Sequence, residues 1–268
     1  MSKKIILLAG PTASGKSKLA ISLAKKLNGE IINADSMQIY KEFSILSSRP
    51  SKIEIKQAKH HLYGVISVKK YFSAGDWLKE SKKTINHCLK KKKIPIIVGG
   101  TGLYFNTITK GISKIPDIDV KTRNKVRNLF KKLGFSRFYE KLLKLDPKVK
   151  NKILPTDSQR AQRAYEVKLK TKKSLFDWIA NTKSDFLDYD LKKIFLNTPK
   201  EELLKKISKR TEIMFKKKCI NEVKRFIFLK PNKSLSANKL IGVQEIKNHL
   251  TGFITLEQCK EMINIKTR

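Results

Sequence analysis

The sequence predicts an α/β fold built on a parallel sheet, and three observations lead to that class. Short apolar runs of strand length alternate with segments of helical spacing over the first hundred residues. Turns rich in glycine follow two of these runs directly, as expected where a strand passes into a helix. The G-x-x-x-x-G-K-[ST] spacing of a phosphate-binding loop occupies one such turn, from Gly10 to Ser17. We therefore expect ligands at the carboxyl edge of the strands.

Four apolar runs have the length of strands. The first, 4–9, leads into the phosphate-binding loop and a helix over 16–27, which an Asn-Gly pair ends. Ser73 and Asp76 have the spacing of a capping box at the start of a second long helix. The remaining predictions are strands over 30–34, 94–98 and 192–197, a helical stretch over 201–228 and a polar loop over 229–240.

The texture of the sequence changes between residues 113 and 189. Apolar residues there recur at helical spacing, lysines are frequent and no strong strand pattern is present. We interpret 113–189 as a helical insertion into an α/β core domain formed by 1–112 and 190–268.

The chain is strongly basic, with a formal net charge of +37 over 268 residues. Lysine accounts for 51 of the 60 basic residues, a bias that an AT-rich genome gives to a whole proteome. A solvated lysine surface is therefore one explanation of the charge. A polyanionic partner such as a nucleic acid is the other, because bound cations release counterions from it.

Other features of the composition indicate a cytoplasmic protein. No run of about 18 apolar residues exists, so we expect no membrane span. The three cysteines form no C-x-x-C pair, and we expect free thiols in a reducing compartment. His60 and His61 have no cysteine or carboxylate partner at metal-ligand spacing, so we interpret them as core or loop residues.

The residues of the phosphate-binding loop suit an anion. Glycines let the backbone curl so that successive N–H groups point at phosphate oxygens, and the helix that follows presents its positive end. Lys16 adds a charge, and Ser17 offers a hydroxyl to Mg²⁺. The predicted phosphate-binding residues are Gly10, Pro11, Thr12, Ala13, Ser14, Gly15, Lys16 and Ser17.

Asp35 is the acidic residue at the end of a predicted strand. Many phosphate-loop NTPases hold Mg²⁺ with an acid at the end of another apolar strand, but strand 94–98 runs into a Gly-Gly-Thr turn at Thr101. A carboxylate at Asp35 would face the phosphates, where it could assist Mg²⁺ or accept a proton from a nucleophile. The alternative is that Asp35 only caps the next helix.

A second polar cluster lies inside the insertion. Thr156 or Asp157 would cap a helix whose first turns carry two of the nine arginines of the chain, with two glutamines between and before them. Guanidinium and amide groups read phosphates and bases well. A solvated helix face with incidental arginines is the other interpretation.

Three motifs in order, "GPTASGKS", "ADSMQIYK" and "VGGTGLYF", followed by "DSQRAQRAYEV", resemble those of the tRNA dimethylallyltransferases (isopentenyltransferases). The resemblance extends from Ile5 to near Ile263. It implies a P-loop NTPase-like fold, similar to nucleotide kinases, with the insertion as a tRNA-binding domain. It also implies the family's reaction, in which a dimethylallyl group passes from dimethylallyl diphosphate to N6 of the adenosine 3′ of the anticodon, in tRNAs that read codons beginning with U.

The resemblance implies roles for individual residues. Asp35 accepts a proton from the attacking amine, Thr101 hydrogen-bonds near the bridging oxygen, and Lys16 acts with the loop and a Ser17-held Mg²⁺ on the diphosphate. The expected partners are dimethylallyl diphosphate and the anticodon stem-loop of tRNA, with the target base flipped out and the enzyme a monomer. The residues implied to contact tRNA are Asp35, Ser36, Met37, Gln38, Thr101, Arg123, Gln159, Arg160, Ala161, Gln162 and Arg163.

The sequence departs from the family pattern in places. Lys172 and Lys218 stand where relatives usually have glycine, and Val243 replaces a tyrosine. The sequence ends where relatives continue with a basic, Trp-containing segment, through truncation or through a shortened enzyme. We expect weaker RNA binding than in a longer form.

Three other functions remain open on the residues alone. An adenylate isopentenyltransferase acting on free nucleotides would share the loop and Asp35, although the arginines of the insertion favour a macromolecular substrate. A small-molecule kinase would need the acid that is missing after strand 94–98. An RNA-binding module gated by a nucleotide would bind RNA and release no modified product.

Overall fold

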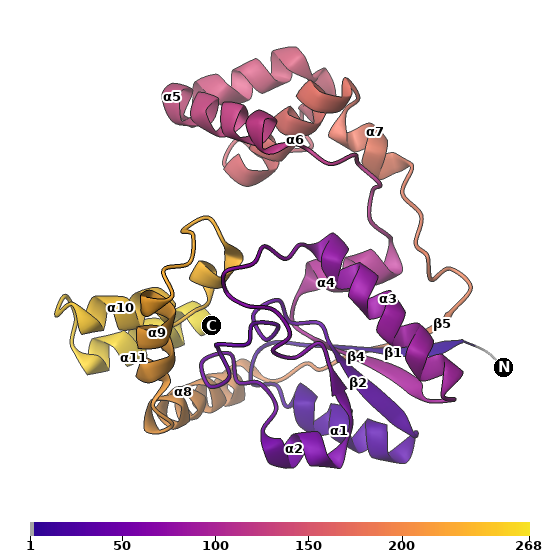
Figure 1. The fold of residues 1–268 in the computed structure, drawn as a ribbon, viewed down its shortest axis with the longest axis vertical. Coiled ribbons are helices and arrows are strands. Elements are labelled where there is room, and N and C mark those ends of the chain that lie inside the picture. Colours follow the sequence, from indigo (N-terminus) through magenta and orange to yellow (C-terminus); the bar gives the residue numbers. More distant parts are fainter. Residues whose placement is uncertain (1–2) are drawn as a thin grey trace. The chain divides into compact units, whose positions relative to one another are not determined.

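The computed structural model describes residues 3–268, which contain a five-stranded parallel sheet with helices on both faces (Figure 1). The strand order is β3-β2-β4-β1-β5, so each crossover places a helix against the sheet. This order and the parallel pairing confirm the predicted fold class. The strands are β1 (Lys4–Ala9), β2 (Gly29–Asn33), β3 (His60–His61), β4 (Ile94–Gly99) and β5 (Asp190–Phe195).

The central strands are buried on both faces, which explains their continuous apolar runs. Ile6 and Leu8 of β1 pack with Ala20 of the helix α1 on one face of the sheet. On the other face α3 runs along the sheet, with its Trp77 fully buried (Figure 1). The capping box predicted for Ser73 and Asp76 is present at the start of α3. The helices beside the sheet are α1 (Lys16–Lys26), α2 (Lys52–Gln57), α3 (Ala74–Lys90) and α4 (Gly102–Thr109).

Four helices follow β5 and pack on one another. The predicted helical stretch over 201–228 divides in two, because Lys218 takes a left-handed conformation with φ of 62°. The predicted polar loop over 229–240 contains the short 3-10 helix η2 (Ser236–Lys239). The helices of this part are α8 (Lys200–Lys216), α9 (Cys219–Phe228), α10 (Val243–Leu250) and α11 (Leu256–Thr267).

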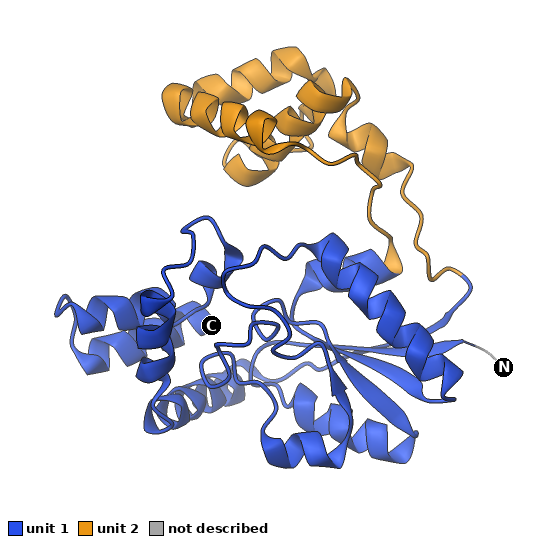
Figure 2. Ribbon diagram, in the orientation of Figure 1, with its two compact units in different colours: residues 1–108, 188–268 blue, residues 109–187 orange. Residues whose placement is uncertain are grey.

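The described chain forms two compact units, residues 3–108 with 188–268 and residues 109–187 (Figure 2). The second unit is helical, and its boundaries lie a few residues from those predicted for the insertion. This unit has its own hydrophobic core, which includes Phe138, Leu142 and Val167. Its elements are α5 (Val120–Leu145), η1 (Pro147–Val149), α6 (Ser158–Thr171) and α7 (Leu175–Ala180).

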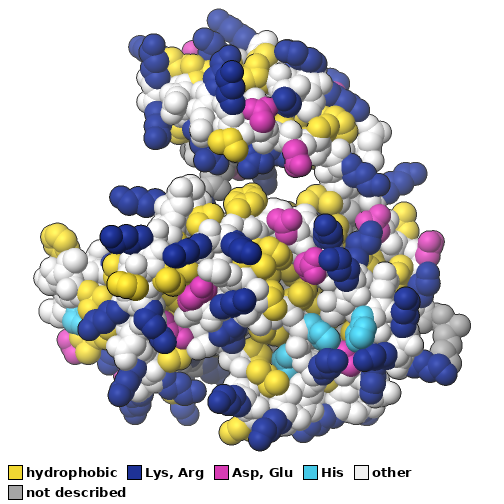
Figure 3. Space-filling view, in the orientation of Figure 1, with side chains coloured by type: hydrophobic (Ala, Val, Ile, Leu, Met, Phe, Trp, Pro, Cys, Tyr) yellow, Lys and Arg dark blue, Asp and Glu magenta, His cyan; other side chains and the backbone are white. Residues whose placement is uncertain are grey.

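Lysine and arginine side chains are spread over the whole face drawn in Figure 3 and do not gather in one patch. Charge alone therefore does not locate a nucleic-acid surface on this face. No helix among residues 3–268 combines the length and the apolar character needed to cross a bilayer. The three cysteines are free and buried.

Candidate active site

The phosphate-binding loop joins β1 to α1. Gly15, the residue before α1, has φ of 90°, which glycine adopts without strain. No side chain in the described residues caps α1, so its first N–H groups are available to an anion. Ser14 Oγ is buried and has no hydrogen-bond partner within residues 3–268. A phosphate group in the loop could accept hydrogen bonds from these N–H groups and from the hydroxyl of Ser14.

Lys16 reaches back over the loop from the first turn of α1. Its Nζ donates hydrogen bonds to the carbonyl oxygens of Gly10, at 2.8 Å, and Pro11, at 2.5 Å. Burial lowers the pKa of Lys16 to about 8; Asp35 raises it in part, and Arg210 lowers it further. A bound diphosphate would place negative charge beside this partly desolvated ammonium group and so stabilise its protonated form.

Asp35 directly follows the segment that leaves β2 and belongs to a turn. Its Oδ1 accepts a hydrogen bond from the N–H of Met37 at 2.9 Å. No helix begins between β2 and α2 in the described chain, so the alternative that Asp35 caps a helix is wrong. Asp35 lines a cavity together with Thr12.

Asn33, which the sequence did not indicate, holds this turn. It is fully buried, its Oδ1 accepts from the N–H of Asp35 at 2.8 Å, and its Nδ2 donates to the carbonyl oxygen of Asp35 at 2.9 Å. The indole N–H of Trp77 donates to the carbonyl oxygen of Asn33 at 2.7 Å. The backbone of Asp35 is therefore tied to the core on both sides.

Thr101 lies across from this turn, in the segment between β4 and α4. Its Oγ1 accepts from the N–H of Ser36 at 2.9 Å and lies 3.3 Å from Ser36 Oγ. Its own N–H donates to the carbonyl oxygen of Ala34 at 3.1 Å. Thr101 and the Asp35 turn, which are distant in the sequence, thus form one hydrogen-bonded unit at the carboxyl edge of the sheet.

Arg210 on α8 completes the charged groups of the site, and sequence reasoning missed it. Together with Thr12 and Asp35 it lines a cavity of about 200 Å³. Burial lowers the pKa of Arg210. The carboxylate of Asp35 raises it in part, and the net pKa lies below its ordinary value. A second cavity, of about 660 Å³, also contains Arg210, so this guanidinium borders both spaces. An anion in the loop would therefore meet Lys16 and Arg210.

Gln38, one of the residues implied to contact RNA, has its amide engaged. Its Nε2 donates to the carbonyl oxygens of Ser47 and Ser48, each at 3.0 Å. Met37 lines the smaller cavity beside Asp35. Asp35 and Met37 thus line the cavity, and the amide of Gln38 is held by two carbonyl groups of a neighbouring loop.

Mg²⁺ would find oxygen donors here. Ser17 is exposed in the first turn of α1, and Asp35 offers a carboxylate at the cavity. Mg²⁺ usually takes one or two protein oxygens and completes its shell with water and substrate phosphates. The donor set of the loop fits this cation.

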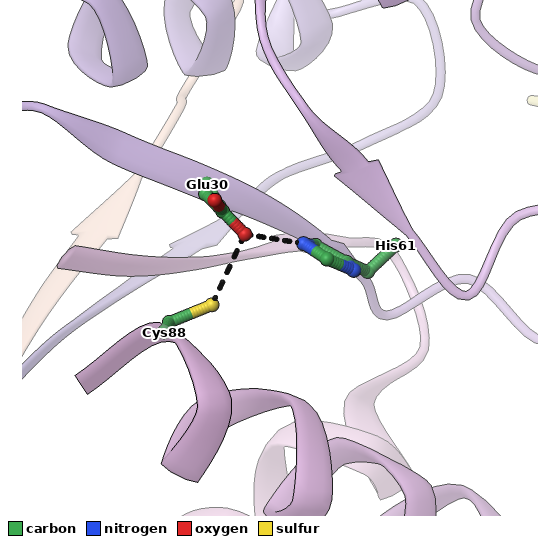
Figure 4. A group of neighbouring side chains, drawn as sticks. All are labelled: Glu30, His61 and Cys88. Atoms are coloured by element: carbon green, nitrogen blue, oxygen red, sulfur yellow. Dashed lines mark hydrogen bonds and ion pairs between the residues drawn. The ribbon is translucent and has the colours of Figure 1, made fainter. Parts of the chain in front are cut away.

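A separate cluster of potential metal ligands lies at the other end of β2 (Figure 4). His61 Nε2 lies 2.6 Å from Glu30 Oε2, and Cys88 Sγ lies 3.6 Å from the same oxygen. Burial, reinforced by Glu30, raises the pKa of the Cys88 thiol to about 12, so the thiol stays protonated and donates to the carboxylate. His61 thus has partners that its sequence neighbours did not reveal. The cluster ties β2 to β3 and α3 and does not belong to the candidate active site.

The predicted RNA-contacting residues of the second unit gather around α6. Asp157 accepts from the N–H of Arg160 at 2.9 Å and caps this helix, as predicted. Arg163 Nη1 lies 3.6 Å from Glu166 Oε2. Gln159 and Arg160 are exposed, and Gln162 and Arg163 are half-buried.

Two of the residues predicted to contact RNA have side chains that are wholly or partly buried. Ala161 is completely buried in the core of the unit, so its methyl group packs α6 and is not available to RNA. Arg123 on α5 has a buried Nε without a hydrogen-bond partner in the described residues. A guanidinium placed in this way can still offer its other N–H groups.

Comparison with known proteins gives one consistent family. A family model described as IPP transferase matches residues 38–268. Among curated proteins, the tRNA dimethylallyltransferase of Pelagibacter ubique is 54% identical over 265 residues, which cover 99% of this chain and 85% of that protein. The enzyme of the same name from Rickettsia massiliae is 41% identical, over 99% of this chain and 74% of that protein.

Solved structures agree with the sequence matches. A full-length tRNA isopentenylpyrophosphate transferase from Bacillus halodurans is 28% identical, with a TM-score of 0.69, and is matched over 99% of this chain and 83% of that one. A eukaryotic dimethylallyltransferase described as acting on tRNA is also 28% identical, with a TM-score of 0.85, over 99% of this chain and 67% of that one.

Proposed function

The chain belongs to the IPP transferase family, and we propose on that basis that it is a tRNA dimethylallyltransferase. It transfers a dimethylallyl group from dimethylallyl diphosphate to N6 of the adenosine 3′ of the anticodon, in tRNAs that read codons beginning with U. The products are N6-isopentenyladenosine and diphosphate. The observation that carries the proposal is that a carboxylate, Asp35, and a half-buried cation, Arg210, line one cavity together with Thr12 of the phosphate-binding loop.

The loop and the two cations serve the leaving group. As the bond between the allylic carbon and oxygen breaks, negative charge grows on the diphosphate. The uncapped start of α1, Lys16 at the loop and Arg210 at the cavity beside Thr12 would receive this charge. Such preorganised electrostatic stabilisation is commonly the largest contribution to catalysis. When bound, Mg²⁺ at Ser17 would neutralise part of the same charge.

Asp35 serves the acceptor. As the N6 amine attacks the allylic carbon, it must lose a proton, and a carboxylate at the cavity wall can take it. The hydrogen bonds from Asn33 fix the backbone of Asp35, while Thr101 holds the neighbouring Ser36. The adenine must leave its stack to reach this position, as in other enzymes that modify a base.

The second unit serves the RNA. Arg160 and Arg163 present guanidinium groups on one turn of α6, and Arg123 lies on the adjacent helix α5. Guanidinium groups bind phosphate and base edges of nucleic acids. An enzyme that acts only on free nucleotides would not need this unit, which therefore favours tRNA over AMP as the acceptor.

The kinase alternative finds little support. β4 ends in Gly99 and is followed by Gly100 and Thr101, so the acid that usually assists Mg²⁺ in phosphate-loop kinases is missing at that strand. The available carboxylate, Asp35, follows β2, where it is suited to deprotonate an acceptor.

A transfer assay tests the proposal. The purified chain is incubated with Mg²⁺, dimethylallyl diphosphate labelled in the prenyl group, and either an anticodon stem-loop with the target adenosine or AMP. We expect label in the stem-loop and none in AMP, and loss of the label with Asp35→Ala. Label in AMP alone would reassign the chain to the free-nucleotide enzymes. Absence of label from both acceptors would contradict the proposal.

A further inference from the structure

A carboxylate from a distant helix holds the loop that follows the Asp35 turn. Glu222 on α9 is 2% exposed, and its two oxygens accept four hydrogen bonds. Oε1 accepts from the N–H and the hydroxyl of Ser44, each at 2.8 Å, and from the N–H of Ile45 at 2.9 Å. Oε2 accepts from the N–H of Leu46 at 2.9 Å. All four bonds go to three consecutive residues of one loop.

This loop is also fixed from a second side. Gly242, before α10, has φ of 100°, and a Cβ built there would lie 2.6 Å from Leu46 Cδ1. The side chain of Leu46 therefore fills the space that any larger residue would need. Glu222 and Gly242, both from the helices after β5, hold the backbone and the side chain of the same loop.

The loop in turn orients Gln38. Its next two carbonyl groups, at Ser47 and Ser48, accept both N–H groups of the Gln38 amide. A primary amide has two donors and one acceptor oxygen. The atom that Gln38 can present to a bound base is therefore Oε1, an acceptor. Leu46 and Ser47 also line the cavity that contains Asp35.

An acceptor in this position distinguishes bases by their exocyclic group. The N6 amine of adenine donates hydrogen bonds, whereas guanine and inosine carry an acceptor oxygen at C6. A site that presents a fixed acceptor rejects the second class, because two acceptors face each other without a proton. If the amide could rotate, Gln38 would offer either an oxygen or an N–H, and this discrimination would be lost.

We propose that Glu222 is a positioning residue for recognition of the target adenosine: it fixes the loop whose carbonyl groups orient the Gln38 amide with its oxygen towards the base. The inference rests on the proposed function, because it assumes an adenosine acceptor. It adds a residue from α9, far from Gln38 in the sequence, to the determinants of base specificity.

The test is Glu222→Gln in the full chain. A glutamine would keep one acceptor and turn an NH₂ group towards backbone N–H groups, so the loop would lose part of its support. We expect KM for the adenosine stem-loop to rise about tenfold or more, the loss of roughly one charge-assisted hydrogen bond. KM for dimethylallyl diphosphate should change less than about twofold, since the phosphate-binding loop does not contact Glu222.

Specificity is the second readout. An inosine-bearing stem-loop acts as a competitive inhibitor, and the ratio of its Ki to the KM of the adenosine stem-loop measures discrimination. We expect this ratio to fall in Glu222→Gln. Glu30→Gln, which removes another buried carboxylate at the opposite end of the sheet, is the control for lost stability and should leave the ratio unchanged. An unchanged ratio in Glu222→Gln would overturn the inference.

A double-mutant cycle keeps the test independent of folding. If Glu222 acts through Gln38, its substitution should add little to KM or to discrimination in a Gln38→Ala background. Ser44→Ala, which removes one of the four hydrogen bonds, should give a smaller change in the same direction and take the place of Glu222→Gln if that variant does not fold. Additive effects of either variant with Gln38→Ala would contradict the inference. Failure of the unmodified chain to prenylate RNA would instead contradict the proposed function.

Discussion

The side chain of Asn33 is bonded to both backbone polar atoms of Asp35, accepting from its N–H at 2.8 Å and donating to its carbonyl oxygen at 2.9 Å. The same amide donates to the carbonyl oxygen of Leu62 at 3.1 Å. One buried asparagine thus fixes the backbone of the residue that carries the proposed catalytic carboxylate. Binding of the diphosphate does not depend on this contact, because Asn33 does not line the cavity that contains Thr12 and Arg210.

Asn33→Ala should therefore lower kcat more than it raises KM. Loss of these three hydrogen bonds lets the Asp35 turn relax, and small displacements of a reacting group cost about 10²-fold in rate. We expect kcat to fall about 10- to 100-fold and KM for dimethylallyl diphosphate to stay within about threefold. Steady-state kinetics with the stem-loop measure both. A variant that loses diphosphate affinity at unchanged kcat would disprove the positioning role.

The pKa of Lys16 predicts an alkaline limb in the pH profile. Burial lowers this pKa to about 8, and the protonated form is the one that binds a diphosphate. As the pH rises through about 8, the free enzyme loses this charge, so kcat/KM for dimethylallyl diphosphate should decline. kcat, which reports the complex, should decline less, because the bound diphosphate holds the proton on Lys16. In Lys16→Ala the alkaline limb attributed to this residue should be absent; its persistence would assign the limb to another group.

Arg210→Ala tests the half-buried cation that lines the cavity. Hydrogen bonds to charged groups contribute roughly 1.5–3 kcal/mol, so KM for dimethylallyl diphosphate should rise about 10- to 100-fold. Arg225→Ala is the matched control, because Arg225 is an exposed arginine on the neighbouring helix α9 and does not line the cavity. Equal effects of the two substitutions would show that Arg210 acts only through the overall charge.

Elements encoded by local patterns were predicted well, and those that depend on tertiary contacts were not. A stretch of about ten residues is enough to recognise the phosphate-binding loop, the capping box at Ser73 and the strand that precedes Thr101. β3 has only two residues, too few for any periodicity to reveal. Lys218 was recognised as an unusual residue in a position for glycine, but the sequence did not show that the helix breaks there.

The site shows the same limit. Asp35 stood out because it ends an apolar strand, but the importance of Arg210 depends on how α8 packs beside the loop. Arginine is scarce in this lysine-rich chain, which marks Arg210 as well as Arg160 and Arg163, but only the last two stand close together in the sequence. Glu222 resembles an ordinary acid of an amphipathic helix until its four hydrogen bonds are seen. In each case the information lies in contacts between residues far apart in the chain.

The Glu30–His61 pair should make stability depend on pH. Burial raises the pKa of Glu30, but the hydrogen bond and charge of His61 outweigh this, and the net pKa lies below the usual range. A carboxyl group whose pKa is lowered by folding stabilises the protein above its unfolded pKa, about 4.3, and ceases to do so as the pH falls through the folded value. Glu30→Gln should cost about 1–3 kcal/mol at pH 7. This difference should shrink below pH of about 4, as followed by urea unfolding; a constant difference would contradict the ionic role of Glu30.

Removal of Arg160 and Arg163 should weaken RNA binding through charge. Each guanidinium that neutralises a phosphate of a single strand contributes about 0.7 to the slope of log K against log[salt]. Arg160→Ala with Arg163→Ala should therefore lower this slope by about 1.4 and raise the Kd of the stem-loop, with KM for dimethylallyl diphosphate unchanged. Lys90→Ala with Lys91→Ala removes the same charge from the exposed end of α3 and is the control. If both pairs change the slope equally, RNA binding follows the net charge of the surface, and α6 has no special part in it.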